Sequence, residues 1–72
     1  MKKNLLSYEN LMDVTYDSGN NSYTLEFQES GKSYFIRVDA RDHEEAATNE
    51  DYFDDKERVE EIIAEAEEIE EA

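Results

Sequence analysis

Three segments of the chain alternate apolar and polar residues with a period of two, and this pattern restricts the fold most strongly. The segments 11–17, 22–29 and 33–39 each predict a strand with one buried face. Between them, residues 18–21 (SGNN) and 29–32 (ESGK) supply side chains that tolerate tight turns. Three strands joined by two short turns indicate an antiparallel meander.

The same alternation predicts which face of the meander is buried. The apolar residues of that face are Met12, Val14, Tyr16, Tyr23, Leu25, Phe27, Tyr34, Ile36 and Val38. Phe35 falls on the opposite face, where it could cover a sheet edge, pack under the N-terminal residues or contact a partner. Before the strands, Asn4 to Asn10 predicts a short helical turn or an irregular lead-in.

The last third of the chain changes to a helical period. Its apolar residues recur every three or four positions, at Val59, Ile62, Ile63, Ala66 and Ile69. This spacing predicts a helix near 54–70, with Asp54 as N-cap because Glu57 completes a D-x-x-E box. A helix continuous from about residue 49 is the alternative. A second D-x-x-E box, which begins at Asp42, predicts a short extra helix.

Together these elements predict an α+β fold, with a three-stranded antiparallel meander packed against a C-terminal acidic amphipathic helix. The 72 residues are expected to form one small domain: lead-in 1–10, meander 11–40 and acidic helical segment 42–72. The chain has no cysteine, which excludes disulfides and agrees with a cytoplasmic location. No run approaches the ~20 apolar residues of a membrane span.

The negative charge is concentrated in the second half of the chain. Residues 1–41 hold six acids and five bases, a net of −1, so residues 42–72 carry −13 of the total −14. Such a field repels nucleic acid and anionic membranes and attracts basic surfaces. We therefore expect a basic protein partner, no direct nucleic acid binding and no membrane binding, with the chain itself a monomer or homodimer.

No catalytic motif is present. His43 is the one histidine, and nothing near it resembles a nucleophile elbow. Both glycines, Gly19 and Gly31, lie in the expected turns, which excludes a phosphate-binding glycine loop. We expect no enzymatic activity and no cofactor.

A dedicated metal site is not expected either, although one group of carboxylates could supply oxygen ligands. Asp39, Asp42 and Glu44 or Glu45 could approach a hard cation. The EF-hand pattern and its glycine are missing from this segment. Weak and non-specific binding of Ca²⁺ or Mg²⁺ is the consequence we expect of so acidic a surface.

Residues 54–71 hold ten carboxylates. On a helix that rises ~1.5 Å per residue they would span about 27 Å, or one charge per roughly 2.7 Å, against ~1.7 Å along duplex DNA. Like charges at i,i+4, such as Glu57 and Glu61, cost such a helix a few tenths of a kcal/mol. A solvated face that maintains solubility is the alternative, but solubility alone would allow lysines among the acids. We therefore interpret the charge as functional.

The expected partner-binding residues combine these acids with an aromatic pair. Tyr52 and Phe53 lie within EDYFDD, and aromatic rings are frequent anchors at interfaces, although packing onto the helix is equally open. The full set is Asp51, Tyr52, Phe53, Asp54, Asp55, Glu57, Glu60, Glu61, Glu65, Glu67 and Glu68.

In size, charge and lack of cysteine, with a meander beside EDYFDDKERVEEIIAEAEEIEEA, the chain resembles the small acidic DNA-mimic inhibitors encoded by bacteriophages. That group includes anti-restriction proteins, uracil-DNA glycosylase inhibitors, anti-CRISPR proteins and sliding-clamp inhibitors. The resemblance implies a protein of the host-cell cytoplasm that occupies the DNA-binding groove or channel of a host DNA-processing or defence protein. Because these inhibitors share no single fold, it implies no particular site residues.

Two other functions fit the same sequence. An immunity-like or antitoxin-like protein would neutralise a basic toxin or nuclease by the same electrostatics. A regulatory module would bind a protein partner through the sheet and Phe35, with the charge incidental.

Overall fold

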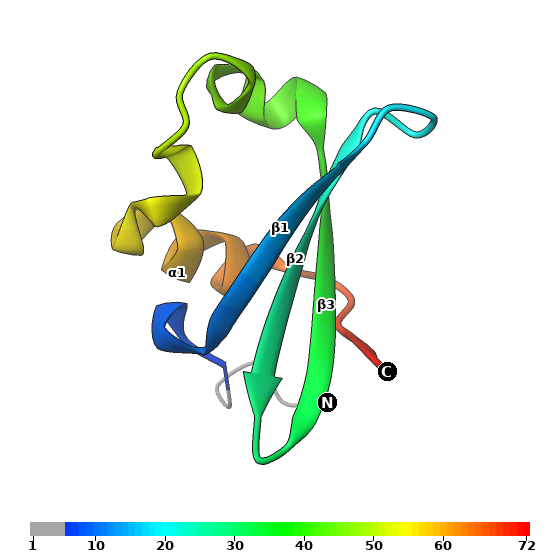
Figure 1. The fold of residues 1–72 in the computed structure, drawn as a ribbon, viewed down its shortest axis with the longest axis vertical. Helices are drawn as coiled ribbons and strands as arrows, with labels where there is room; N and C mark the ends of the chain where they lie inside the picture. Colours follow the sequence, from blue (N-terminus) through cyan, green and yellow to red (C-terminus); the bar gives the residue numbers. More distant parts are fainter. Residues whose placement is uncertain (1–5) are drawn as a thin grey trace.

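The computed structural model describes residues 6–72 and has an α+β architecture (Figure 1). The sheet contains four antiparallel strands, β1 (Leu11–Asp17), β2 (Ser22–Glu29), β3 (Lys32–Asp39) and β4 (Glu70–Glu71), in the order β1-β2-β3-β4. The three predicted strands are confirmed. The fourth strand corrects the prediction of a three-stranded sheet.

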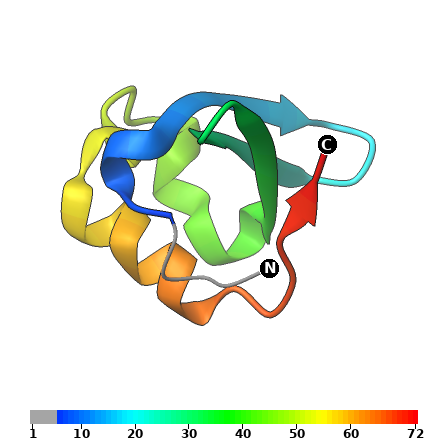
Figure 2. The same cartoon turned by 90° about the horizontal axis from the view of Figure 1, so that it is seen from below.

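Helical segments cover one face of this sheet. They are the α-helix α1 (Lys56–Glu65) and the 3-10 helices η2 (Tyr8–Asn10), η3 (Ala40–Ala47) and η4 (Tyr52–Asp54). Figure 2 views the molecule from below and shows α1, η4 and η3 on the same side of the sheet. The lead-in prediction for Asn4 to Asn10 falls partly outside the described residues, and η2 is its described part.

The turns of the meander form where the sequence places residues that tolerate positive φ. Between β2 and β3, Ser30 and Gly31 have φ of 54° and 77°. Positive φ at both central residues is the geometry whose twist matches two antiparallel strands. The strands then stay in register from the pair Glu29 and Lys32 to the pair Ser22 and Asp39.

The core lies between the sheet and α1. Its buried members are Leu6, Leu25, Phe27, Tyr34, Ile36, Val59, Ile62 and Ile63. Ala66 and Ile69 are partly buried against this cluster, so the predicted apolar stripe does face the sheet. Leu25, Phe27 and Val59 are 0% exposed.

Two residues predicted for the buried face are exposed. The β1–β2 register shifts between Leu11 and Asp13, which makes Met12 the extra residue of a β-bulge and leaves it 60% exposed. Leu11 packs against the core in its place. Tyr16 pairs with Tyr23 across the strands, but its side chain is 51% exposed and is not among those that pack on the core.

The predicted start of the long helix is wrong by about one residue. Asp55, and not Asp54, is the N-cap: its carboxylate accepts hydrogen bonds from the N–H groups of Glu57 and Arg58. A helix continuous from residue 49 is also absent, because the extended backbone of Asp55 (ψ 111°) separates η4 from α1.

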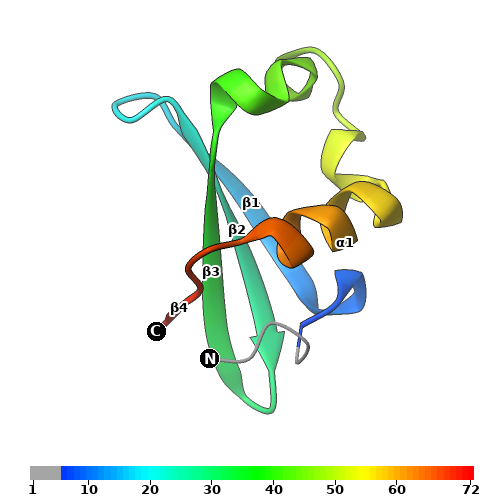
Figure 3. The same ribbon diagram turned by 180° about the vertical axis from the view of Figure 1, so that it is seen from behind.

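The predicted end of the helix, near residue 70, is also wrong, because α1 stops at Glu65 and Ala66 is extended. The segment that follows returns to the sheet, where β4 pairs with Tyr34 and Phe35 of β3 (Figure 3). The N–H of Ala72 donates to the carbonyl of Ser33 at 2.9 Å. Consecutive carboxylates are unfavourable at the negative end of a helix dipole, whereas the open edge of β3 offers main-chain partners.

The extra helix predicted from Asp42 forms as η3, but it begins earlier and is not an α-helix. Asp39 caps it by accepting a hydrogen bond from the Arg41 N–H. His43 has non-helical angles (φ −139°, ψ 47°), which kink the segment in its middle. The kink turns the His43 side chain to contact η4, as described below.

Candidate functional site

Most carboxylates of the acidic half are exposed and form no ion pair with another described residue. Among residues 6–72 there are three ion pairs: Lys32 with Glu71, Arg41 with Asp39, and Arg58 with Asp55. All three are solvent-accessible, and such pairs contribute little to stability. The negative charge of this half therefore remains largely uncompensated at the surface.

The predicted partner-binding acids are nearly all accessible. The exposed members are Asp51, Asp54, Asp55, Glu57, Glu61, Glu65, Glu67 and Glu68. Two members of the predicted set have structural contacts: Asp55 caps α1, and Glu60 accepts a hydrogen bond from the Tyr8 N–H at 2.6 Å. The remaining acids are available to a partner.

The aromatic pair consists of one buried ring and one half-buried ring. Tyr52 is 7% exposed, its hydroxyl lies 2.8 Å from Nδ1 of His43, and the guanidinium of Arg58 lies 4.0 Å from its ring centre. Arg58 also donates to the Tyr52 carbonyl at 3.1 Å. These contacts fasten η3, η4 and α1 together. Phe53 is half-buried and packs on Tyr23, with ring centres 5.3 Å apart.

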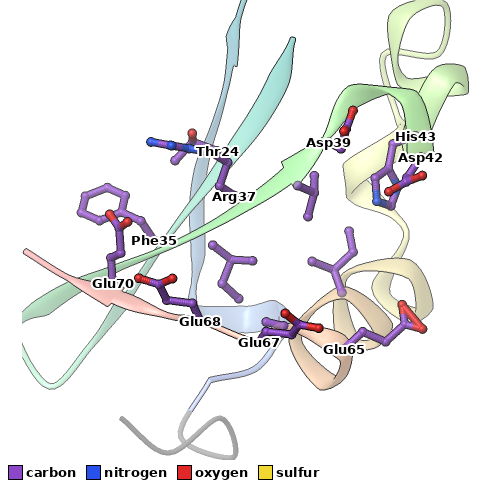
Figure 4. A pocket seen from close by; sticks show the side chains of 14 residues that line it. Thr24, Phe35, Arg37, Asp39, Asp42, His43, Glu65, Glu67, Glu68 and Glu70 are labelled. Carbon is purple, nitrogen blue, oxygen red and sulfur yellow. The ribbon is translucent and has the colours of Figure 1, made fainter. Parts of the chain in front are cut away.

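A groove of about 490 Å³ lies between β3, the end of α1 and the segment 66–70 (Figure 4). We call it the β3 groove. Its apolar lining comes from Ile36, Val38, Ile62 and Ala66. Its carboxylates come from two separate stretches of the chain, 39–42 and 65–70, and are Asp39, Asp42, Glu65, Glu67, Glu68 and Glu70. Arg37 and His43 are the two basic side chains of the lining.

A second groove, of about 450 Å³, lies along β1 beside η2 and η4. Its apolar lining comes from Tyr8, Leu11, Met12, Val14 and Phe53. Four carboxylates, Glu9, Asp13, Glu50 and Asp54, complete the lining, and no basic residue is among them. Both edges of the meander therefore carry an apolar depression bordered by acids.

The two grooves bring together residues that the sequence pattern did not select for partner binding. The added acids are Glu9, Asp13, Asp39, Asp42, Glu50 and Glu70. In each groove, acids from distant parts of the chain become neighbours only after folding. Asp39 and Asp42 are possible cation ligands by sequence. Among residues 6–72, however, no three His, Asp or Glu side chains are arranged to hold a metal.

Two carboxyl groups of the sheet ends have lowered pKa values. Hydrogen bonds from the Arg41 side chain, followed by that from its N–H, lower the pKa of Asp39 to about 2. Hydrogen bonds from the side chain and N–H of Asn20 lower the pKa of Asp17. Both groups therefore stay negative in mildly acidic solution.

No family model, curated protein or solved structure matches this chain. No helix within residues 6–72 is long and apolar enough to cross a membrane.

Proposed function

We propose that the protein is a phage-encoded DNA-mimic inhibitor that occupies the DNA-binding groove or channel of a host DNA-processing or defence protein. The observation that carries this proposal is the exposure of the acidic half with few ion pairs. A surface of this kind presents a negative field to a basic groove and accelerates association with it.

The charge of the whole molecule supports the proposal better than the charge of one helix does. A helix with a DNA-like line of carboxylates is not formed, because α1 contains only Glu57, Glu60, Glu61 and Glu65. The longest extent of the molecule is 32 Å, and its net charge is −14. A duplex of that length carries roughly 19 phosphates at one per ~1.7 Å. The two charges are of the same order.

The proposal is tested by capturing the partner and competing it with DNA. The protein is used as bait in a host lysate at low and high salt, and the captured protein is purified. Binding should weaken steeply with salt, and duplex DNA titrated against the complex should displace the inhibitor. If DNA and the protein bind the partner together without interference, or the partner has no nucleic acid site, the mimic function is wrong.

Charge-reversal variants test whether the acidic surface makes the contact. We expect a triple variant, Glu65→Lys with Glu67→Lys and Glu68→Lys, to lose inhibition while keeping its circular dichroism spectrum. Single neutralisations, such as Glu61→Gln, should change affinity little because the field is distributed. Phe53→Ala should cost more than any single neutralisation if its ring anchors the interface. A triple variant that inhibits normally would contradict the proposal.

A further inference from the structure

The outer edge of β3 is paired along only part of its length. β4 pairs with Tyr34 and Phe35, whereas β3 continues to Asp39. On the inner side, the Ala40 N–H donates to the Asn21 carbonyl, and on the outer side, the Ser33 carbonyl accepts from Ala72. Main-chain groups alternate between the two sides of a strand, so Arg37 and Asp39 face outward with Ser33 and Phe35.

Beyond Phe35, β3 therefore presents main-chain groups that no described residue pairs. The outward N–H and carbonyl of Arg37 and the N–H of Asp39 have no hydrogen-bond partner among residues 6–72. The segment 66–69 does not pair with this stretch, because the chain leaves α1 after Glu65 and pairs with β3 only from Glu70. The β3 groove opens along this stretch, with Phe35, Arg37 and Asp39 in its lining.

The other edge of the sheet is obstructed near the start of its strand. On β1, the N–H of Val14 is taken by the carboxylate of Asp13 at 2.9 Å. The bulge at Met12 also interrupts the regular ladder of that strand. Bulges and edge charges are the usual means by which proteins block unwanted pairing. The end of β3 has no such bulge in its register with β2, and its unpaired main-chain groups lie beside a groove.

The lining of the β3 groove defines the chemistry of that strand. Carboxylates from η3, the end of α1 and the segment 66–70 surround the unpaired stretch, and Arg37 and His43 are the basic exceptions. Two half-buried apolar side chains, Val38 and Ala66, lie between these acids. An extended segment that alternates basic and aliphatic side chains matches both the charge and the apolar lining.

We infer that the β3 groove binds an extended basic segment of the partner, which adds as a strand to the edge of β3 at Arg37 and Asp39. This inference rests on the proposed function, which supplies the basic character of the partner. It adds how one segment of that partner is bound. Main-chain hydrogen bonds supply the geometry, and lysine or arginine side chains contact the surrounding carboxylates.

The probe for this inference is an acetylated and amidated heptapeptide of alternating lysine and valine, added at physiological salt. Hydrogen exchange followed by NMR should show new protection of the Arg37 and Asp39 amides, because both become paired. A peptide of the same sequence with every amide N-methylated keeps the charge but loses the donors. It should bind about tenfold more weakly, the effect of one or two lost hydrogen bonds.

Two double variants distinguish contacts with the groove carboxylates from the general electrostatic attraction of the protein. Glu67→Gln with Glu68→Gln should weaken peptide binding by roughly fivefold, as expected for two exposed charge pairs. Glu57→Gln with Glu61→Gln removes the same charge from exposed residues outside the groove lining and should change binding much less. Equal losses in the two variants would overturn the inference.

Three further outcomes would also overturn it: no binding of the peptide, binding without protection of Arg37 and Asp39, or equal binding of the N-methylated peptide. The result is independent of the DNA competition described above. If the captured partner protects the two amides but binds DNA at the same time, strand addition stands and the mimic function fails. If DNA displaces the protein but the amides stay unprotected, the mimic function stands and strand addition fails.

Discussion

At the scale of single residues, a small number of apolar side chains holds α1 on the sheet. Val59, Ile62 and Ile63 are the buried residues of the helix. They meet Leu25, Phe27 and Ile36 of the central strands in one cluster. Because a domain of this size buries little apolar surface, each of these contacts is a large part of its stability.

Replacing Ile63 by aspartate should unfold the domain or detach α1. Ile63 is 6% exposed, and an unpaired carboxylate there would cost several kcal/mol, comparable with the whole stability of a small domain. The thermal melt followed by circular dichroism measures the effect. Glu61→Gln, an exposed change on the same helix, is the control and should melt like the unaltered protein. An unchanged melt for Ile63→Asp would show that the stripe does not support the fold.

The carboxylate of Asp39 should make stability depend on pH. Its pKa is lowered from 3.8 to about 2 by Arg41, so its contribution is complete above pH 3.8 and is lost as the pH falls toward 2. Asp39→Asn should therefore be less stable than the parent near pH 7, and the difference should disappear near pH 2. Urea titrations at several pH values measure it, with Glu44→Gln of η3 as control. A difference that persists unchanged at pH 2 would contradict this cause.

At the scale of elements, the ends of α1 decide the shape of the acidic half. The helix begins where Asp55 caps it and ends at Glu65, which leaves the following carboxylates on an extended segment. That segment closes one side of the β3 groove and places β4 on the sheet. A helix continued to residue 70 would leave both the groove and β4 unformed.

Removing the N-cap carboxylate of Asp55 should destabilise the protein more than removing the neighbouring carboxylate of Asp54. Asp55→Ala removes the acceptor for the N–H groups of Glu57 and Arg58, at a cost of about 1 kcal/mol. Asp54→Ala changes the charge equally but leaves the cap in place. Urea denaturation at neutral pH compares the two variants. Equal losses would indicate that Asp54 contributes to the cap as the sequence pattern predicts.

At the scale of the whole molecule, self-repulsion opposes folding. The chain carries 21 acids against seven lysines and arginines, and its described part contains three exposed ion pairs. Exposed charges separated by more than ~10 Å are largely screened at 0.1 M salt. Moderate salt therefore removes much of the repulsion. It also screens the three ion pairs, but these contribute little to stability.

The melting temperature should accordingly rise between 10 and 300 mM NaCl. Over this range the screening length shortens from about 30 Å to less than ~10 Å. Mild acidification should also relieve the repulsion before specific contacts such as that of Asp39 are lost. Differential scanning calorimetry at constant pH measures the salt effect. A melting temperature that falls steadily over this range would mean that attractive pairs outweigh the repulsion.

The sequence by itself determined the features that depend on neighbouring residues. The alternation of apolar side chains located the three long strands, and Ser30 with Gly31 located a turn that needs positive φ at two successive positions. The spacing of Val59, Ile62 and Ile63 identified the buried stripe of α1. These features follow from local geometry, because side-chain period and backbone φ are properties of short segments.

Only the tertiary structure decided the features that depend on contacts between distant segments. The bulge at Met12 moves Leu11 into the core, and β4 forms because the edge of β3 is available to the chain after α1. The β3 groove likewise combines carboxylates from two distant stretches, 39–42 and 65–70, around the open end of β3. No local period encodes these arrangements, since each depends on which backbone groups and side chains the rest of the fold leaves unpaired.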